Sequence, residues 1–262
     1  MNAPGILAEI VARKKQELKA LRPQLAEFER RAADQKGRQR GFFSSLRIRA
    51  VISPAIIAEI KQASPSRGLL TTDFRPTRTA RSYELGGAAA LSVLTDQDFF
   101  KGSLDDMVSV RGAVGLPILR KDFTIEELNI VEAAAWGADA ILLIAALHDA
   151  IALRRLREFA ASLGVDALVE VHDDTELKAA LDSGATLVGV NNRDLRTFEV
   201  TLNTSLRLAA LMPPNIFKVS ESGIFTAQHI ATLRQAGYQA FLVGESLMKA
   251  PDPAAALREL TA

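Results

Sequence analysis

The amino-acid sequence predicts an α/β protein built as a (β/α)8 TIM barrel with an N-terminal helical extension. The first observation is a recurring order of amphipathic segment, glycine and short apolar run, which is typical of a helix, its C-terminal turn and a strand. The second is that eight such apolar runs lie roughly 20–35 residues apart, the spacing of βα units. The third is the length of 262 residues, which suits one such barrel. A doubly wound sheet is the alternative, but its GxGxxG turn is missing from the sequence.

The helical extension covers residues 1–50, and residues 6–23 show the helical pattern most clearly. We expect it to pack on the barrel domain, residues 51–262. The helical periodicity does not show whether the extension contacts the functional pocket. Five barrel strands follow a glycine, at 89–94, 139–145, 166–171, 186–191 and 239–244. Three more are apolar runs that stop at charged residues, at 55–60, 117–120 and 215–220. Such continuous apolar runs indicate strands buried on both faces, as in a parallel sheet.

Composition and charge exclude several classes of protein. Hydrophobic residues make up 48% and charged residues 24% of the chain, which excludes a disordered protein. The sequence has no cysteine, so disulfides, thiolate metal sites and a cysteine nucleophile are excluded, and a reducing cytoplasm fits. No apolar stretch reaches the roughly 18 residues of a membrane span, and no signal-peptide pattern begins the chain. We expect a cytoplasmic protein without metal or membrane partners, as a monomer or weak homodimer.

The extension is basic, with 12 Lys and Arg against 5 Asp and Glu, while the rest of the chain carries 20 against 26. A basic arm can bind nucleic acid. Here the charges alternate with glutamate and apolar residues, and no nucleic-acid motif accompanies them. We therefore favour a solvated helical extension and expect no nucleic-acid partner.

Charged and polar residues interrupt five of the apolar runs at the same end. Charged side chains are costly to bury unless they are paired, so one such residue would indicate a structural ion pair. Five strands with this feature indicate one shared polar pocket, because a TIM barrel carries its chemistry at the C-terminal ends of its strands. The residues are Glu59, Lys61, Lys121, Glu170, Asn191, Arg193 and Glu221.

Lys121 and Glu170 are the candidate acid and base. A lysine near other cations or in a partly dry site has a lowered pKa and serves as a general acid near neutral pH, and a carboxylate beside it is the complementary base. Glu59 and Lys61 are two residues apart, so they share one strand face, where they can also form a simple ion pair. Barrel rims carry structural ion pairs too, so that alternative stays open for each residue.

The roles of three other polar residues near these strand ends follow from their side-chain chemistry and from strand alternation. Asn191 and Arg193 offer donors suited to hydroxyl groups or an anion. We place His172 out of phase with Glu170, facing the helical layer in a structural role.

The last two strands end in glycine beside serine, at SESGI (220–224) and VGESL (243–247). Barrels often bind phosphate with these two loops through backbone N–H groups. Ser64, in a Pro-containing loop that could fold over the site, is a further donor. The candidates in the two loops are Ser222, Gly223, Gly244, Glu245 and Ser246.

Six segments closely resemble the indole-3-glycerol phosphate synthase family, in the right order over nearly the whole chain. They are EIKQASPSRG (59–68), SVLTDQDFFKGS (92–103), PILRKDF (117–123), LVEVHDDTEL (168–177), GVNNRDLRTF (189–198) and VSESGI (219–224). The resemblance implies conversion of 1-(2-carboxyphenylamino)-1-deoxyribulose 5-phosphate into indole-3-glycerol phosphate with release of CO₂ and water, in tryptophan biosynthesis. It implies a carboxy-lyase without metal or organic cofactor.

The resemblance also implies residue roles. Lys121 would be the general acid, Glu170 the general base, and Lys61 the ligand of the substrate carboxylate with a shared part in proton transfer. Glu59 and Asn191 would hold the anilino and hydroxyl groups. Phosphate would fall on Ser64, Gly223, Gly244, Glu245 and Ser246. Phe100 and Phe123 are placed to contact the aromatic ring, with core packing as the alternative. Gln62, Ala63 and Thr201 depart from the family pattern at positions outside the proposed proton transfer.

Three other functions compete with this one. Phosphoribosylanthranilate isomerase would want a Cys or Asp acid–base pair, and this chain has no cysteine. A Schiff-base aldolase would use Lys121, Lys61 or Lys218, and a covalent lysine adduct would reveal it. A catalytically dead scaffold barrel would lack a strand-end acid or base, and none is missing here.

Overall fold

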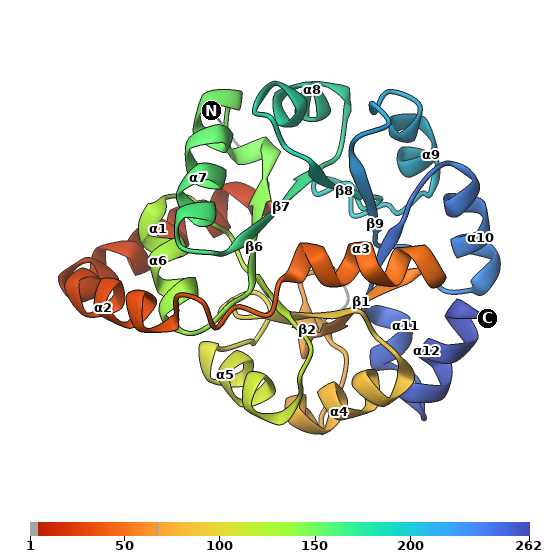
Figure 1. The fold of residues 1–262 in the computed structure, drawn as a ribbon, viewed down its shortest axis with the longest axis horizontal. Coiled ribbons are helices and arrows are strands. Elements are labelled where there is room, and N and C mark those ends of the chain that lie inside the picture. Colours follow the sequence, from red (N-terminus) through yellow and green to blue (C-terminus); the bar gives the residue numbers. More distant parts are fainter. Residues whose placement is uncertain (1–4, 67) are drawn as a thin grey trace.

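The computed structural model describes residues 5–66 and 68–262 and has a closed barrel of eight parallel strands (Figure 1). The strands pair in the order β1-β10-β9-β8-β7-β6-β5-β4, so each strand neighbours the next one in the chain and β10 closes on β1. This confirms the predicted fold. The bounds are β1 (Ala55–Ile60), β4 (Ala90–Leu94), β5 (Ile118–Lys121), β6 (Ala140–Ile144), β7 (Asp166–Val171), β8 (Leu187–Asn191), β9 (Phe217–Glu221) and β10 (Ala240–Val243).

Helices surround the barrel between successive strands (Figure 1). Gly137 and Gly237, with φ of 82° and 93°, end their helices in the left-handed conformation, so the expected order of helix, glycine and strand is present. The helices are α4 (Pro76–Gly86), α5 (Leu104–Ala113), α6 (Glu127–Ala135), α7 (Ala150–Ser162), α8 (Asp174–Asp182), α9 (Asn203–Ala209), α10 (Ala227–Gln235), α11 (Glu245–Met248) and α12 (Pro253–Thr261), with a 3₁₀ turn at Ala145–Leu147.

Strand alternation divides the apolar residues into two layers. Ile56 and Ala58 of β1 belong to the large cluster between strands and helices, whereas Ala55 and Ile57 belong to the smaller cluster inside the barrel. Glu59 lies two residues after Ile57 and therefore also faces inward. The strand-end residues of β5, β7 and β9 each lie two residues after an inward-facing apolar residue; the pairs are Leu119 and Lys121, Leu168 and Glu170, and Val219 and Glu221. The polar strand ends therefore form one layer directly above the apolar barrel interior.

The extension contains α1 (Ile6–Leu21), a 3₁₀ turn (Arg22–Gln24), α2 (Leu25–Gln35) and α3 (Phe42–Ile52). In Figure 1, α2 lies beside α6 and α3 crosses the end of the barrel nearest the viewer. The Arg31 guanidinium lies 3.9 Å from the centre of the Trp136 ring, and Phe42 and Leu46 of α3 join the cluster inside the barrel. The extension thus packs on the barrel, as expected.

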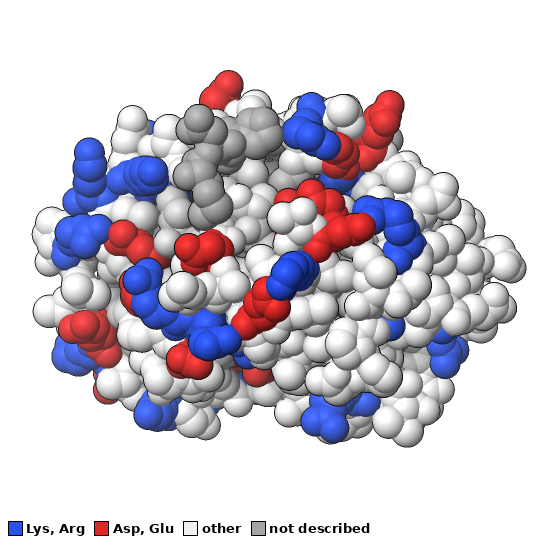
Figure 2. Space-filling view, turned by 90° about the horizontal axis from the view of Figure 1, so that it is seen from above, with Lys and Arg blue, Asp and Glu red and all other residues white. Residues whose placement is uncertain are grey.

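Two surface features complete the fold. A short antiparallel hairpin, β2 (Ala63–Ser64) with β3 (Gly68–Leu69), stands where the sequence predicts only a loop. On the face shown in Figure 2, Lys and Arg are interspersed with Asp and Glu. Among the residues that the structure describes, no helix is long and apolar enough to cross a bilayer.

Candidate active site

One pocket at the C-terminal ends of the strands brings together nearly all of the predicted site residues. Ser246 is the exception, because it is not among the lining residues and its hydroxyl donates to the Ile224 carbonyl at 3.3 Å. Predicted residues that line the pocket are Glu59, Lys61, Ser64, Phe100, Lys121, Phe123, Glu170, Asn191, Arg193, Glu221, Ser222, Gly223, Gly244 and Glu245.

The centre of the pocket is a lysine among carboxylates. Lys121 Nζ lies 3.1 Å from Glu170 Oε2 and 3.9 Å from Glu221 Oε2. Asn191 Nδ2 donates to Glu170 Oε1 at 3.2 Å. Glu170 and Glu221 are each only 1% exposed, so these charges interact through little water. The candidate acid and base are therefore in direct contact.

The surroundings of Lys121 correct one expectation from the sequence. Burial lowers the pKa of Lys121, but the charges of Glu170, Glu221 and Glu59 outweigh burial, so its pKa lies above its usual value. The prediction of a lowered pKa was wrong because the neighbours are carboxylates and not cations. Lys121 therefore holds its proton at neutral pH, as a proton donor must.

The two buried carboxylates have opposite pKa shifts. Burial raises the pKa of Glu170, but the Lys121 charge, the nearby His172 ring and the hydrogen bond from Asn191 hold it well below its usual range. Burial and the Glu170 charge raise the pKa of Glu221 above its usual range. Glu170 is thus the carboxylate of the pair, which is the form that accepts a proton.

Glu59 and Lys61 face the pocket together, as their spacing predicts, and Lys61 Nζ donates to Glu59 Oε1 at 2.5 Å. Gly244 makes room for this pair, since a Cβ atom there would lie 2.4 Å from Glu59 Oε1. The glycine after β10 is therefore required by the carboxylate beside it, in addition to any part in anion binding.

The loop after β9 has an unusual backbone. Ser222 has φ of 66°, a left-handed value that few residues other than glycine adopt, and Gly223 follows with 77°. Asn192 Nδ2 donates to the Ser222 carbonyl and to Ser220 Oγ, both at 3.0 Å, and so fixes the loop. Across the pocket, Arg193 Nη2 lies 3.9 Å from Glu245 Oε2. Successive left-handed residues expose backbone N–H groups that suit an anion.

His172 corrects a second expectation. Its Nε2 lies 3.3 Å from Glu170 Oε1, and its Nδ1 lies 2.9 Å from Glu176 Oε2. The assignment to the helical layer was wrong because residues two apart on an extended chain, such as 170 and 172, share a face. His172 is not among the lining residues of the pocket, so it supports Glu170 from behind.

The stabilising contribution of His172 should depend on pH. Burial lowers the pKa of His172, but the adjacent Glu170 and Glu176 carboxylates outweigh burial and raise it to about 10, from an ordinary 6.5. Because the folded pKa is the higher one, the contribution is full below about pH 6.5 and is lost as the pH rises through about 10. Denaturant unfolding of the wild type and His172→Gln from pH 6 to pH 10.5 should show a shrinking difference in unfolding free energy. A difference that stays constant over this range would contradict the prediction.

Apolar residues that the sequence did not reveal line the remaining wall. Ile6, Leu7 and Ile10 reach the pocket from α1, so the extension takes part in the site. The rings of Phe100 and Phe123 are 6.1 Å apart and tilted by 39°, and both line the pocket. In the described part of the chain, no group of three or more His, Cys, Asp or Glu side chains could hold a metal ion.

A closed barrel with a paired lysine and glutamate and two glycine loops at its strand ends defines an acid–base enzyme of the (β/α)8 class. The family model of indole-3-glycerol phosphate synthase matches residues 7–260. The chain belongs to this family, which consists of carboxy-lyases of tryptophan biosynthesis.

Individual relatives agree with this assignment. The chain is 52% identical to an indole-3-glycerol phosphate synthase of Koribacter versatilis (strain Ellin345), over 89% of both chains. It is 48% identical to one of Desulfotalea psychrophila, over 97% of this chain and 98% of the relative.

Two solved structures share the fold alone. A thiamine phosphate pyrophosphorylase of Pyrococcus furiosus has a TM-score of 0.58 at 17% identity, over 79% of this chain and 93% of that one. KGPDC of Streptococcus mutans has a TM-score of 0.58 at 14% identity, over 79% and 95%.

Proposed function

We propose that the pocket converts 1-(2-carboxyphenylamino)-1-deoxyribulose 5-phosphate into indole-3-glycerol phosphate, CO₂ and water, with Lys121 as acid and Glu170 as base. The observation that carries these roles is the 3.1 Å contact between Lys121 Nζ and Glu170 Oε2 inside the pocket. A proton donor and an acceptor so close together can serve successive steps on one substrate.

In the first step, the ring carbon that bears the carboxylate bonds to the ketone carbon of the sugar chain. The Lys121 ammonium gives its proton to the ketone oxygen, which becomes a hydroxyl group. The carboxylate then leaves as CO₂, and its bonding electrons restore the aromatic ring. In the last step, Glu170 takes a proton from the neighbouring CH₂ group. The hydroxyl leaves as water with a second proton from one of the two lysines, which forms the indole double bond.

The other pocket residues bind the substrate in this proposal. Lys61 pairs with the substrate carboxylate, and Glu59 and Asn191 hold the anilino and hydroxyl groups. Phe100 and Phe123 contact the aromatic ring. The phosphate takes backbone N–H groups and hydroxyls from the loops after β9 and β10 and from the hairpin. These residues are Ser64, Glu221, Ser222, Gly223, Gly244 and Glu245, with Arg193 beside them.

Incubation of the purified chain with the carboxyphenylamino-deoxyribulose phosphate tests the function directly. We expect indole fluorescence to appear together with one CO₂ per turnover. Borohydride added during turnover should leave the protein mass unchanged. A borohydride-trapped lysine adduct would contradict the acid–base roles and favour the Schiff-base alternative.

We further propose that residues 51–262 are the catalytic barrel domain and residues 1–50 its extension. The cysteine-free sequence supports a cytoplasmic location. We expect a monomer or weak homodimer, which sedimentation at micromolar concentration would measure.

A further inference from the structure

Lys14 is a buried charge on the pocket-facing side of the extension. The buried residues of α1 are Leu7, Ile10, Lys14 and Leu18, which form one helical stripe, and Lys14 is only 4% exposed. Its neighbours in this stripe, Leu7 and Ile10, line the active-site pocket, whereas Lys14 itself does not. A lysine at such a position needs carboxylate partners that compensate for its lost hydration.

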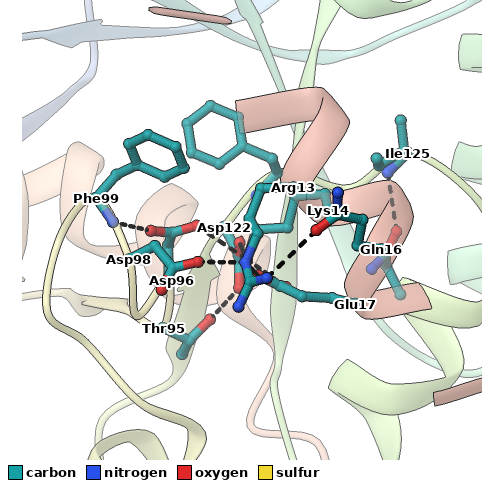
Figure 3. Close-up of polar contacts among 12 residues, drawn as sticks. Arg13, Lys14, Gln16, Glu17, Thr95, Asp96, Asp98, Phe99, Asp122 and Ile125 are labelled. Atoms are coloured by element: carbon teal, nitrogen blue, oxygen red, sulfur yellow. Dashed lines mark hydrogen bonds and ion pairs between the residues drawn. The ribbon is translucent and has the colours of Figure 1, made fainter. Parts of the chain in front are cut away.

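Two buried aspartates are these partners (Figure 3). Lys14 Nζ lies 3.0 Å from Asp96 Oδ2 and 2.8 Å from Asp122 Oδ1, with Glu17 of its own helix at 2.9 Å. Asp96 is fully buried and Asp122 is 6% exposed. Burial lowers the pKa of Lys14, but the aspartate charges outweigh burial, so the lysine is charged. One ammonium group thus joins the ends of β4 and β5.

Each aspartate also holds the backbone beside a pocket phenylalanine. Asp96 Oδ1 accepts the N–H of Phe99, next to Phe100, at 2.8 Å. Asp122 Oδ1, the oxygen that contacts Lys14, accepts the N–H of Phe123 at 2.8 Å. The other oxygen of Asp122 is held separately by Thr95 and Arg120. Without Lys14, the Asp122 oxygen that accepts the Phe123 N–H would therefore lose its ion-pair partner.

We propose that Lys14 is a positioning residue that sets the geometry of the Phe100–Phe123 pair and thereby the recognition of the substrate's aromatic ring. The proposal rests on the proposed function, in which these rings contact the anilino ring. It gives the extension a defined part in the reaction: α1 places its apolar residues on the pocket and, through the Lys14 ammonium, fixes two rings that line the same pocket.

The variant Lys14→Met keeps the aliphatic stem and removes the charge. We expect KM for the carboxyphenylamino-deoxyribulose phosphate to rise by about tenfold, the value of a well-placed aromatic contact. The value of kcat should fall less than KM rises, because Lys121 and Glu170 keep their contact. The inhibition constant of glycerol 3-phosphate, which has the phosphate but no ring, should change less than about twofold.

Two further variants make the test specific. Lys15→Met, at the exposed neighbouring position on α1, should leave KM unchanged. Lys14→Met combined with Asp96→Asn removes one uncompensated carboxylate, so it supplies a folded protein if the single variant unfolds, and the same rise in KM is expected. An unchanged KM, or equal weakening of substrate and glycerol 3-phosphate, would overturn the proposal and reduce Lys14 to a structural ion pair. If the wild type itself does not turn over the substrate, the proposed function fails first, independently of Lys14.

Discussion

Lys121→Met should lose turnover by at least about a hundredfold, the lower end of what a positioned acid or base contributes. Lys121 is the group whose proton reaches the ketone oxygen, and methionine fills its space without a proton to give. Binding of glycerol 3-phosphate should persist, because the loops proposed to bind phosphate follow β9 and β10, whereas Lys121 lies on β5. The measurement is kcat by indole fluorescence, beside the inhibition constant of glycerol 3-phosphate. A variant that retains a tenth of the wild-type rate would contradict the assignment.

A second substitution separates chemistry from stability. Lys121→Met leaves the buried Glu170 carboxylate without its cation, and loss of one partner of a buried ion pair lowers the unfolding free energy by about 3 kcal/mol. Lys121→Arg keeps the positive charge, but a guanidinium holds its proton too tightly to donate it. We expect the arginine variant to stay folded, as judged by circular dichroism, and still to lose turnover.

Glu170→Gln should also abolish turnover, but it should stop the reaction later. Glutamine keeps the shape and accepts hydrogen bonds but does not take a proton from the CH₂ group. Ring closure and CO₂ loss do not require Glu170, so a ring-closed intermediate heavier than indole-3-glycerol phosphate by one water should accumulate. Rapid quenching followed by mass spectrometry would detect it. An unchanged kcat would remove Glu170 from the role of base.

Glu176→Gln is the matched control for this prediction. Glu176 contacts His172 on the side away from Glu170, so its substitution disturbs the support of the base without removing the base. Turnover should stay within a few-fold of the wild type. A loss equal to that of Glu170→Gln would show that the effect comes from the surrounding hydrogen bonds.

The fold and most of the site follow from local patterns in the sequence. Gly137 and Gly237 mark helix ends because the left-handed turn they adopt is local, and it fixes where the next strand begins. Alternation along β1 places Glu59 on the inner side with Ile57 for the same reason. In a closed barrel of eight parallel strands, all C-terminal strand ends lie at one rim, so the charged residues there lie close together.

The remaining features depend on contacts between distant segments. The pKa of Lys121 depends on Glu59, Glu170 and Glu221, which lie on three other strands, so no local pattern shows its direction. His172 is different, because its place beside Glu170 follows from local strand alternation. Lys14 had a weak local signal, since it interrupts the stripe formed by Leu7, Ile10 and Leu18, but its partners lie on β4 and β5.

The extension touches both ends of the barrel, with α1 at the catalytic rim and α3 across the opposite end, and this has a consequence for how the chain is made. Residues 6–52 are synthesised before the barrel strands, but the surfaces they cover include Asp96, Asp122 and the first residues of several later strands. Short helices are marginal in water without a surface to pack on. The apolar stripe of α1 should therefore stay unprotected during synthesis until β5 is complete, because Asp122, a partner of Lys14 in this stripe, directly follows that strand.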